Sequence, residues 1–124
     1  MTATMTTELL GLQPFVPSGP DFEGARALFR DLGFKEMWSG GDYVGFQQGA
    51  ARFILQKYND AHFASNLMIR IDVPNVDAWY AEVAALSLPA KHKGLRINPP
   101  KDFSWGREVH FIDPAGVCWH VGAV

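Results

Sequence analysis

The side chains most able to bind a metal ion or act as a nucleophile are four histidines and one cysteine: His62, His92, His110, His120 and Cys118. No two histidines have the His-x-His or His-Glu-x-x-His spacing that defines a metal site. His110 and His120 flank a predicted turn and could approach each other. Two imidazoles are fewer than the usual three or four ligands, however, and no carboxylate evidently completes the set. We therefore predict no bound metal ion and no cofactor.

Signs of acid–base or nucleophilic catalysis are weak. Cys118 lies between Val117 and Trp119 with no cation nearby in the sequence, which is typical of a buried structural thiol. Glu108 and Asp113 belong to one predicted hairpin and do not form an evident acid–base pair. The chain has no Gly-x-Ser-x-Gly element, phosphate-cradling loop or dinucleotide fingerprint. These observations favour a binding protein over an enzyme.

Aromatic residues carry a stronger signal. They make up 13% of the chain, and most of them are expected in the core. Trp38 and Trp105 differ because each adjoins a glycine-containing turn, Ser39-Gly40-Gly41 or Gly106. An indole at a strand end, with polar neighbours, is suited to stack on a flat ligand, and each such contact contributes on the order of 1 kcal/mol.

The composition predicts a globular protein that is nearly neutral. Its 124 residues, 48% of them hydrophobic, suffice for one domain with a sizeable core. A formal net charge of −2 gives no basic excess for nucleic acid or an anionic membrane. One cysteine cannot form an internal disulfide, no signal peptide is evident, and no apolar run approaches the roughly 20 residues needed to cross a bilayer. We therefore expect a cytoplasmic protein that binds neither nucleic acid nor membranes.

A hairpin near the C-terminus organises the candidate residues. Residues 107–112 and 117–121 alternate bulky apolar and smaller or polar residues, which predicts two strands. Residues 113–116, Asp-Pro-Ala-Gly, predict a tight turn between them. A one-residue shift in register would reverse the face on which His110 and His120 lie. The sequence therefore leaves open whether they face a cleft or the core.

The predicted elements repeat the order strand, helix, strand, strand, strand. In the first half a proline-bearing edge strand at residues 9–16 precedes a helix that ends at Gly33, and in the second half the helix begins after Pro74-Asn75. The other predicted strands cover residues 34–38, 43–47, 52–58, 66–73, 95–98, 107–112 and 117–121. We predict an α+β fold in one domain, residues 1–124, made of two βαβββ modules at about 8–60 and 65–124. Residues 89–104 are expected to be irregular, with Pro99-Pro100 preventing regular pairing there.

Several segments resemble the bleomycin-resistance proteins of the vicinal-oxygen-chelate, or glyoxalase-like, superfamily. The more specific ones are Trp105-Gly106-Arg107-Glu108, Asp113-Pro114-Ala115-Gly116 and Trp119-His120. The others are Pro14-Phe15-Val16, Leu32-Gly33-Phe34-Lys35, Trp38, Asp42-Tyr43-Val44-Gly45-Phe46 and Gln48-Gly49. The resemblance implies paired βαβββ modules whose curved mixed sheet forms a cleft, in a homodimer. It also implies exchange of the N-terminal strand between subunits, since Pro14 matches the proline associated with that arm.

The resemblance implies a function as well. Bleomycin-resistance proteins sequester a glycopeptide drug in clefts at the dimer interface, with no chemistry, and its planar part stacks on aromatic residues. We accordingly predict metal-free binding of a flat, partly aromatic small molecule, a glycopeptide antibiotic or similar. The candidate contacts are Trp38, Phe46, Phe103 and Trp105 as apolar walls, and Gln56, Tyr58, Arg107, Glu108 and His120 as polar groups.

Two alternatives stay open. Metal-using members of the superfamily place His or Glu on the first and last strands of each module, where this chain has Gln13 or Pro14, Gln56, Leu67 or Met68, and His120. Only His120 is a good ligand, which weakens the reading as a metal-dependent lyase or ring-cleaving dioxygenase. The second alternative is a partner-binding or regulatory role. The slight acidity and Lys57 beside the presumed cleft depart from the strongly acidic cleft that suits a cationic drug, so the ligand need not be bleomycin.

Overall fold

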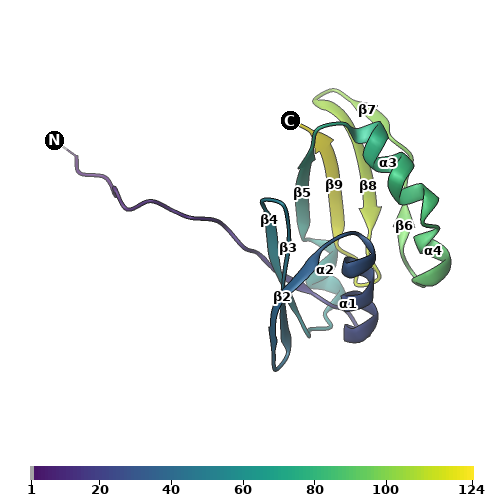
Figure 1. Ribbon diagram of the computed structural model, residues 1–124, viewed down its shortest axis with the longest axis horizontal. Helices are drawn as coiled ribbons and strands as arrows, with labels where there is room; N and C mark the ends of the chain where they lie inside the picture. The colour runs from purple at the N-terminus through teal and green to yellow at the C-terminus, as the bar shows by residue number, and fades with distance from the viewer. Residues whose placement is uncertain (1) are drawn as a thin grey trace.

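The computed structural model describes residues 2–124 as two mixed β-sheets with short helices packed against them (Figure 1). The N-terminal sheet has the strand order β1-β4-β3-β2, with β1 at Phe15–Pro17, β2 at Lys35–Gly40, β3 at Tyr43–Gln48 and β4 at Ala51–Gln56. The C-terminal sheet has the order β5-β9-β8-β6, and β7 also pairs with β8. Its strands are β5 (Met68–Val73), β6 (Arg96–Ile97), β7 (Lys101–Phe103), β8 (Gly106–Ile112) and β9 (Cys118–Ala123). The helices are α1 (Phe22–Asp31), α2 (Ala61–Ser65), α3 (Val76–Ala85) and α4 (Leu88–Lys91).

The predicted α+β fold class is confirmed, and three short elements add to it. Helices α2 and α4 were not predicted; α2 begins where the Asp60 side chain accepts a hydrogen bond from the backbone N–H of Phe63. Pro99-Pro100 lie outside the strands, as predicted, but strand β7, which was not predicted, pairs with β8 directly after them. Residues 101–103 have backbone donors that the prolines lack, and β8 offers them a free edge. Within residues 2–124 no helix is long and apolar enough to cross a bilayer.

The proline-bearing first strand lies at a sheet edge, as predicted, but it covers only Phe15–Pro17 and not residues 9–16. Strand β1 pairs with β4 in parallel, and the carbonyl of Pro14 accepts a hydrogen bond from the N–H of Ile54 at 2.9 Å. The residues before β1 extend away from both sheets (Figure 1). Leu9, Leu10 and Leu12 of this arm are exposed. The arm therefore presents apolar side chains to solvent in a single chain.

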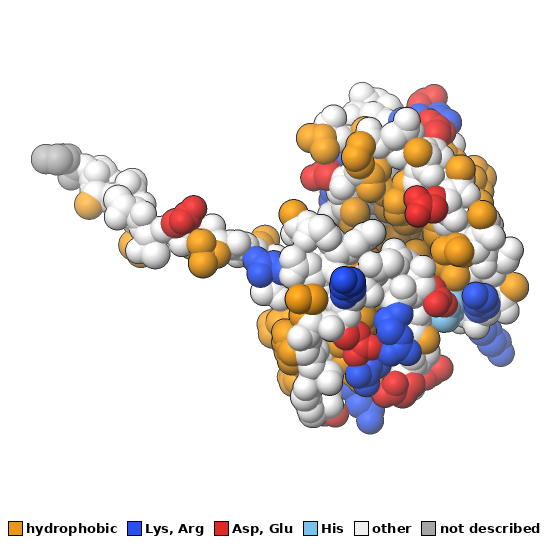
Figure 2. All heavy atoms as spheres, in the orientation of Figure 1, with side chains coloured by type: hydrophobic (Ala, Val, Ile, Leu, Met, Phe, Trp, Pro, Cys, Tyr) orange, Lys and Arg blue, Asp and Glu red, His pale blue; other side chains and the backbone are white. Residues whose placement is uncertain are grey.

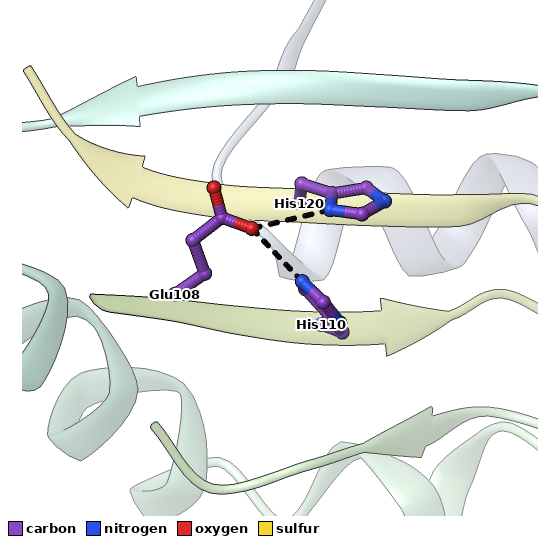
Figure 3. Close-up of side chains that lie close together, drawn as sticks. All are labelled: Glu108, His110 and His120. Atoms are coloured by element: carbon purple, nitrogen blue, oxygen red, sulfur yellow. Dashed lines mark hydrogen bonds and ion pairs between the residues drawn. The ribbon is translucent and has the colours of Figure 1, made fainter. Parts of the chain in front are cut away.

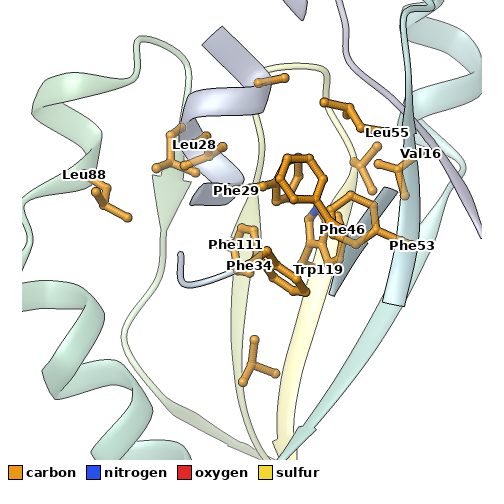
Figure 4. Packing of buried hydrophobic residues seen from close by; sticks show 14 of the residues in the cluster. Val16, Leu28, Phe29, Phe34, Phe46, Phe53, Leu55, Leu88, Phe111 and Trp119 are labelled. Atoms are coloured by element: carbon orange, nitrogen blue, oxygen red, sulfur yellow. The ribbon is translucent and has the colours of Figure 1, made fainter. Parts of the chain in front are cut away.

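The core is centred on aromatic rings that join the two sheets (Figure 4). Trp119 of β9 lies parallel to Phe111 of β8, with ring centroids 5.6 Å apart. It also contacts Phe29 of α1 at 5.3 Å and Phe53 of β4 at 5.4 Å. All four side chains are buried. One indole thus packs against an element of each sheet and against α1.

A buried carboxylate holds the turn before β9. Asp113 Oδ1 accepts hydrogen bonds from the backbone N–H groups of Ala115, Gly116 and Val117, each at 3.0 Å. Its Oδ2 accepts one from the indole N–H of Trp119 at 2.9 Å. Gly116 has φ = 106°, a conformation that favours glycine. Burial raises the pKa of Asp113, while its four hydrogen bonds act in the opposite direction. The carboxylate therefore ties the turn to the central ring of the core.

The hairpin register decides which residues face the core. In the pairing of β8 with β9, Phe111 lies opposite Trp119 and His110 lies opposite His120. Because side chains alternate along a strand, the two histidines lie on the face turned away from Phe111 and Trp119. The register thus answers the question that the sequence leaves open.

Helix α1 is joined to β2 by ion pairs. Glu36 accepts hydrogen bonds from Arg26 at 2.6 and 2.9 Å and also pairs with Arg30. The hydrogen bond from Arg26 lowers the pKa of Glu36, burial opposes this shift, and Arg30 adds to it. In Figure 2, basic (blue) and acidic (red) side chains gather on the part of the visible surface where α1 and β2 lie.

The Asp113 carboxylate is expected to be a large contributor to stability. Asp113→Ala leaves the N–H groups of Ala115 and Val117 and the Trp119 indole without their acceptor, while Gly116 keeps its bond to the backbone carbonyl of residue 113, and we expect the change to lower the free energy of unfolding by about 3 kcal/mol. Urea denaturation measures this change. Asp42→Ala, at an exposed turn, is the matched control and should stay within about 0.5 kcal/mol of the wild type. An equal effect of the two substitutions would contradict the role given to Asp113.

The Glu36 ion pairs are expected to make stability depend on pH. In the folded chain the pKa of Glu36 is below its ordinary value of 4.5. The contribution of the charged Glu36 to the free energy of unfolding is therefore fully present above pH 4.5. It is lost as the pH falls through the lowered folded-state pKa. Glu36→Gln should therefore reduce the free energy of unfolding by about 1 kcal/mol at pH 7, and the difference should shrink below pH 4.5. Glu82→Gln, which removes an exposed carboxylate, is the control for urea denaturation across this range. A difference in free energy of unfolding between Glu36→Gln and the wild type that does not change with pH would contradict the prediction.

Candidate ligand-binding site

The candidate site lies on the face of the C-terminal sheet that is turned away from the core. Glu108 and His110 are two residues apart on β8, so they share a face, and His120 on β9 lies opposite His110. Arg70 on β5 is paired in register with His120 and joins the same face. Figure 3 shows the three side chains of Glu108, His110 and His120 converging from β8 and β9. The β8–β9 pairing thus assembles a cluster of ionisable groups.

Glu108 is the centre of this cluster and is only 3% exposed. Its Oε1 lies 2.9 Å from Nε2 of His110 and 3.2 Å from Nδ1 of His120. Its Oε2 accepts a hydrogen bond from Arg70 at 2.5 Å. Arg70 is held in turn by Asp72 and by the carbonyl of Ala123. A buried carboxylate is tolerated here because each oxygen has a hydrogen-bond partner.

The surroundings of Glu108 favour its charged form. Burial acts to raise the pKa of this carboxyl. Hydrogen bonds from His110, His120 and Trp105, together with the charge of Arg70, outweigh burial, and the pKa is lowered. The cluster therefore presents a carboxylate between two imidazoles. In contrast, burial is the main cause that raises the pKa of the Cys118 thiol, which makes it a poor nucleophile.

A stack of three flat rings lies beside the cluster. Trp105 lies against Phe103 with centroids 4.9 Å apart and planes 13° apart, and Phe103 lies against His110 at 4.8 Å and 17°. Trp105 ends the stack and is 66% exposed. The Lys101 ammonium lies over the Phe103 ring, 5.5 Å from its centroid. The stack thus offers one free indole to a ligand.

A hollow of about 540 Å³ opens next to this stack. It is lined by Asn98, Pro99, Pro100, Lys101, Phe103, Glu108 and His110. The volume lies in the range of small-molecule sites, about 300–1,000 Å³. Residues 98–101, at and before the start of β7, form one wall. Part of the segment that was expected to be irregular, residues 89–104, therefore borders the site.

Four of the nine predicted contact residues come together in this place. Phe103, Trp105, Glu108 and His120 belong to the stack or the carboxylate cluster. Phe46 does not: it is 1% exposed and packs against Phe29, Phe34 and Phe53 in the core. The structure therefore leaves Phe46 no surface on which to contact a ligand, because alternation on β3 turns it to the covered face.

The remaining predicted residues lie elsewhere. Trp38 covers Gly45 on the N-terminal sheet and is 47% exposed, and within residues 2–124 it makes no aromatic contact with Trp105. The Tyr58 hydroxyl donates to Asp60, and Gln56 is half-buried on β4. Arg107 is the neighbour of Glu108 on β8, so its side chain lies on the other face of the sheet. There it forms ion pairs with Asp77 and Asp102. One chain thus places these four residues away from the carboxylate cluster.

Three ionisable residues of the site were not among the predicted contacts: His110, Arg70 and Lys101. His110 is two residues from Glu108, and Arg70 lies on the polar face of a strand that alternates clearly, so both could have been found by requiring a shared face. Lys101 had no such signal, because its place depends on β7 pairing with β8.

The residues at the superfamily's metal positions do not form a ligand set. Of Gln13 or Pro14, Gln56, Leu67 or Met68, and His120, only His120 belongs to a group within residues 2–124 whose ligand atoms lie close enough to hold a metal ion. The expectation that no carboxylate completes the two histidines is wrong, because Glu108 lies within hydrogen-bond distance of both. The ligand atoms of these three residues all lie within 4.8 Å of one another. That the chain holds no metal ion stays a prediction.

Solved structures confirm the resemblance seen in the sequence: the fold is that of glyoxalase-like and bleomycin-resistance proteins. A bleomycin-binding protein from Streptomyces verticillus, complexed with copper(II)-bleomycin, has 26% identity and a TM-score of 0.79, covering 96% of this chain and 99% of that chain. A bleomycin resistance determinant encoded on transposon Tn5 has 20% identity and a TM-score of 0.77, covering 94% and 98%.

Enzymes share the fold as well. A lactoylglutathione lyase from Agrobacterium tumefaciens has 17% identity and a TM-score of 0.67, covering 94% of this chain and 96% of that chain. No protein-family model and no curated protein sequence matches the chain. The fold is therefore established, and the choice between binding and catalysis depends on the side chains of the site.

Proposed function

We propose that the protein binds a flat, partly aromatic small molecule, of the glycopeptide-antibiotic type, and does not convert it. The observation that carries this proposal is the stack of Trp105, Phe103 and His110, which ends in an exposed indole and borders, through Phe103 and His110, a hollow of about 540 Å³. The likeness to a bleomycin-binding protein over 96% of the chain supports the same class of ligand.

The proposed contacts divide into stacking and polar ones. A planar ligand ring extends the stack at Trp105, where an aromatic contact contributes on the order of 1 kcal/mol beyond area burial. Glu108 and Lys101 border the hollow with opposite charges and orient polar groups of the ligand. Neither kind of contact uses a metal ion bound to the protein, so the proposed binding is metal-free.

We infer that the binding cleft is completed by a second copy of the chain. Trp38 lies on the N-terminal sheet and the stack lies on the C-terminal sheet, so a homodimer that pairs unlike sheets supplies both aromatic walls. The arm before β1 exposes Leu9, Leu10 and Leu12. Burial of each leucine contributes about 1.5–3 kcal/mol, which favours exchange of this arm between subunits. The cytoplasmic location stays a prediction.

The stacking role predicts a defined loss of affinity. We expect copper-free and copper-loaded bleomycin to saturate the wild type near one ligand per chain in titrations that follow tryptophan fluorescence and heat together. Trp105→Ala and Trp38→Ala should each raise Kd about fivefold or more, because each removes a contact of about 1 kcal/mol. Leu86→Ala, an exposed apolar residue at the end of α3, is the control and should leave Kd unchanged.

Two results would count against the proposal. If neither tryptophan fluorescence nor heat shows saturation, the protein does not bind a bleomycin-type ligand. If both tryptophan variants keep the affinity of the wild type, the indoles do not stack on the ligand. Light scattering tests the dimer separately, since a mass of one chain would exclude a cleft shared by two copies.

A second candidate function is a metal-dependent lyase or ring-cleaving dioxygenase. The observation that favours it is the cluster of Glu108, His110 and His120, together with the lyase that shares the fold. Incubation of the divalent-metal-loaded protein with candidate ligands separates the two, because chemical conversion of a ligand would favour the enzyme, whereas a bound ion without conversion would not.

A further inference from the structure

The donor set of the carboxylate cluster is that of a transition-metal site. It consists of one carboxylate oxygen and two imidazole nitrogens, Oε1 of Glu108, Nε2 of His110 and Nδ1 of His120. Two histidines and one carboxylate bind Zn²⁺ or Fe²⁺ in proteins and leave further coordination positions open. Imidazole ligands favour such ions over Mg²⁺ or Ca²⁺, which prefer oxygen ligands alone.

The spacing of these atoms already suits one ion. Metal–ligand bonds of about 2.0–2.1 Å place neighbouring ligand atoms about 3 Å apart. Oε1 of Glu108 lies 2.9 Å from Nε2 of His110 and 3.2 Å from Nδ1 of His120, and all three atoms lie within 4.8 Å of one another. Figure 3 shows one nitrogen of each imidazole directed at the same carboxylate oxygen of Glu108.

Groups around the cluster hold the three ligands in place. Arg70 binds Oε2 of Glu108 and leaves Oε1 directed at the histidines. The His110 ring is stacked on Phe103, which restricts its rotation. Nε2 of His120 lies 3.5 Å from Sγ of Cys118, so the other nitrogen, Nδ1, is the one that faces Glu108. Such outer contacts orient metal ligands and set their affinity.

We propose that Glu108, His110 and His120 bind one divalent transition-metal ion, such as Zn²⁺ or Co²⁺, with its open coordination positions directed to the hollow beside residues 98–101. The hollow is lined by Glu108 and His110, so a small molecule that enters it reaches the ion. The site is built by one hairpin, β8 and β9, and needs neither the N-terminal sheet nor a second copy. It also does not depend on the ligand proposed above.

The test is a titration of the untagged, chelator-treated full chain with Co²⁺ alone, followed by visible absorption, with Zn²⁺ in a parallel calorimetric titration. The wild type is expected to bind one ion per chain, and Co²⁺ should show the absorption of a site of low symmetry. His110→Phe keeps a flat ring on Phe103 but removes the nitrogen ligand, and it should weaken binding about 100-fold or more. His120→Ala should have an effect of the same size.

The matched control is His92→Ala. His92 pairs with Asp31 and lies outside the cluster, so this variant should bind Co²⁺ as the wild type does. Circular dichroism and thermal unfolding of each variant show whether it is folded. The absence of stoichiometric binding in the wild type, or equal affinity in folded His110→Phe, would overturn the proposal. No organic ligand is present, so this outcome is independent of the bleomycin titration.

Discussion

The buried Asp113 carboxylate is the constraint on which the C-terminal half of the protein depends. Three backbone N–H groups of the turn and the indole of Trp119 all bind it. Because Trp119 lies parallel to Phe111 on the facing strand and contacts rings of α1 and β4, the carboxylate sets the turn, the register and the position of the hairpin against the core together. A shift of one residue would break all of these contacts at once.

The polar cluster on the opposite face follows from that register. Once Phe111 and Trp119 face the core, His110 and His120 have to lie opposite each other on the other face. Glu108 joins them through the same alternation along β8. Its burial is stable because Arg70 and the two imidazoles satisfy both oxygens. Core packing on one face of the sheet thus decides the chemistry on the other.

The fold alone does not decide the function. Bleomycin-binding proteins and a lyase share it at 17–26% identity, so the sheets supply a frame and the side chains of the open faces supply the activity. In this chain the open face of the C-terminal sheet carries an aromatic stack that ends at Trp105 and a carboxylate between two imidazoles. The stack suits a flat ligand and the imidazoles suit a metal ion, and Phe103, Glu108 and His110 line one hollow.

The sequence by itself determined the elements whose signals are local. The turn at 113–116, the helix end at Gly33 and the proline-bearing edge strand each depend on residues within a few positions of one another, and the structure confirms all three. Only the tertiary structure decided that Phe46 lies in the core, that β7 pairs with β8, and that Glu108 completes a cluster with two histidines. These depend on register and on which sheet face is covered, and both are set by contacts between residues far apart in the chain.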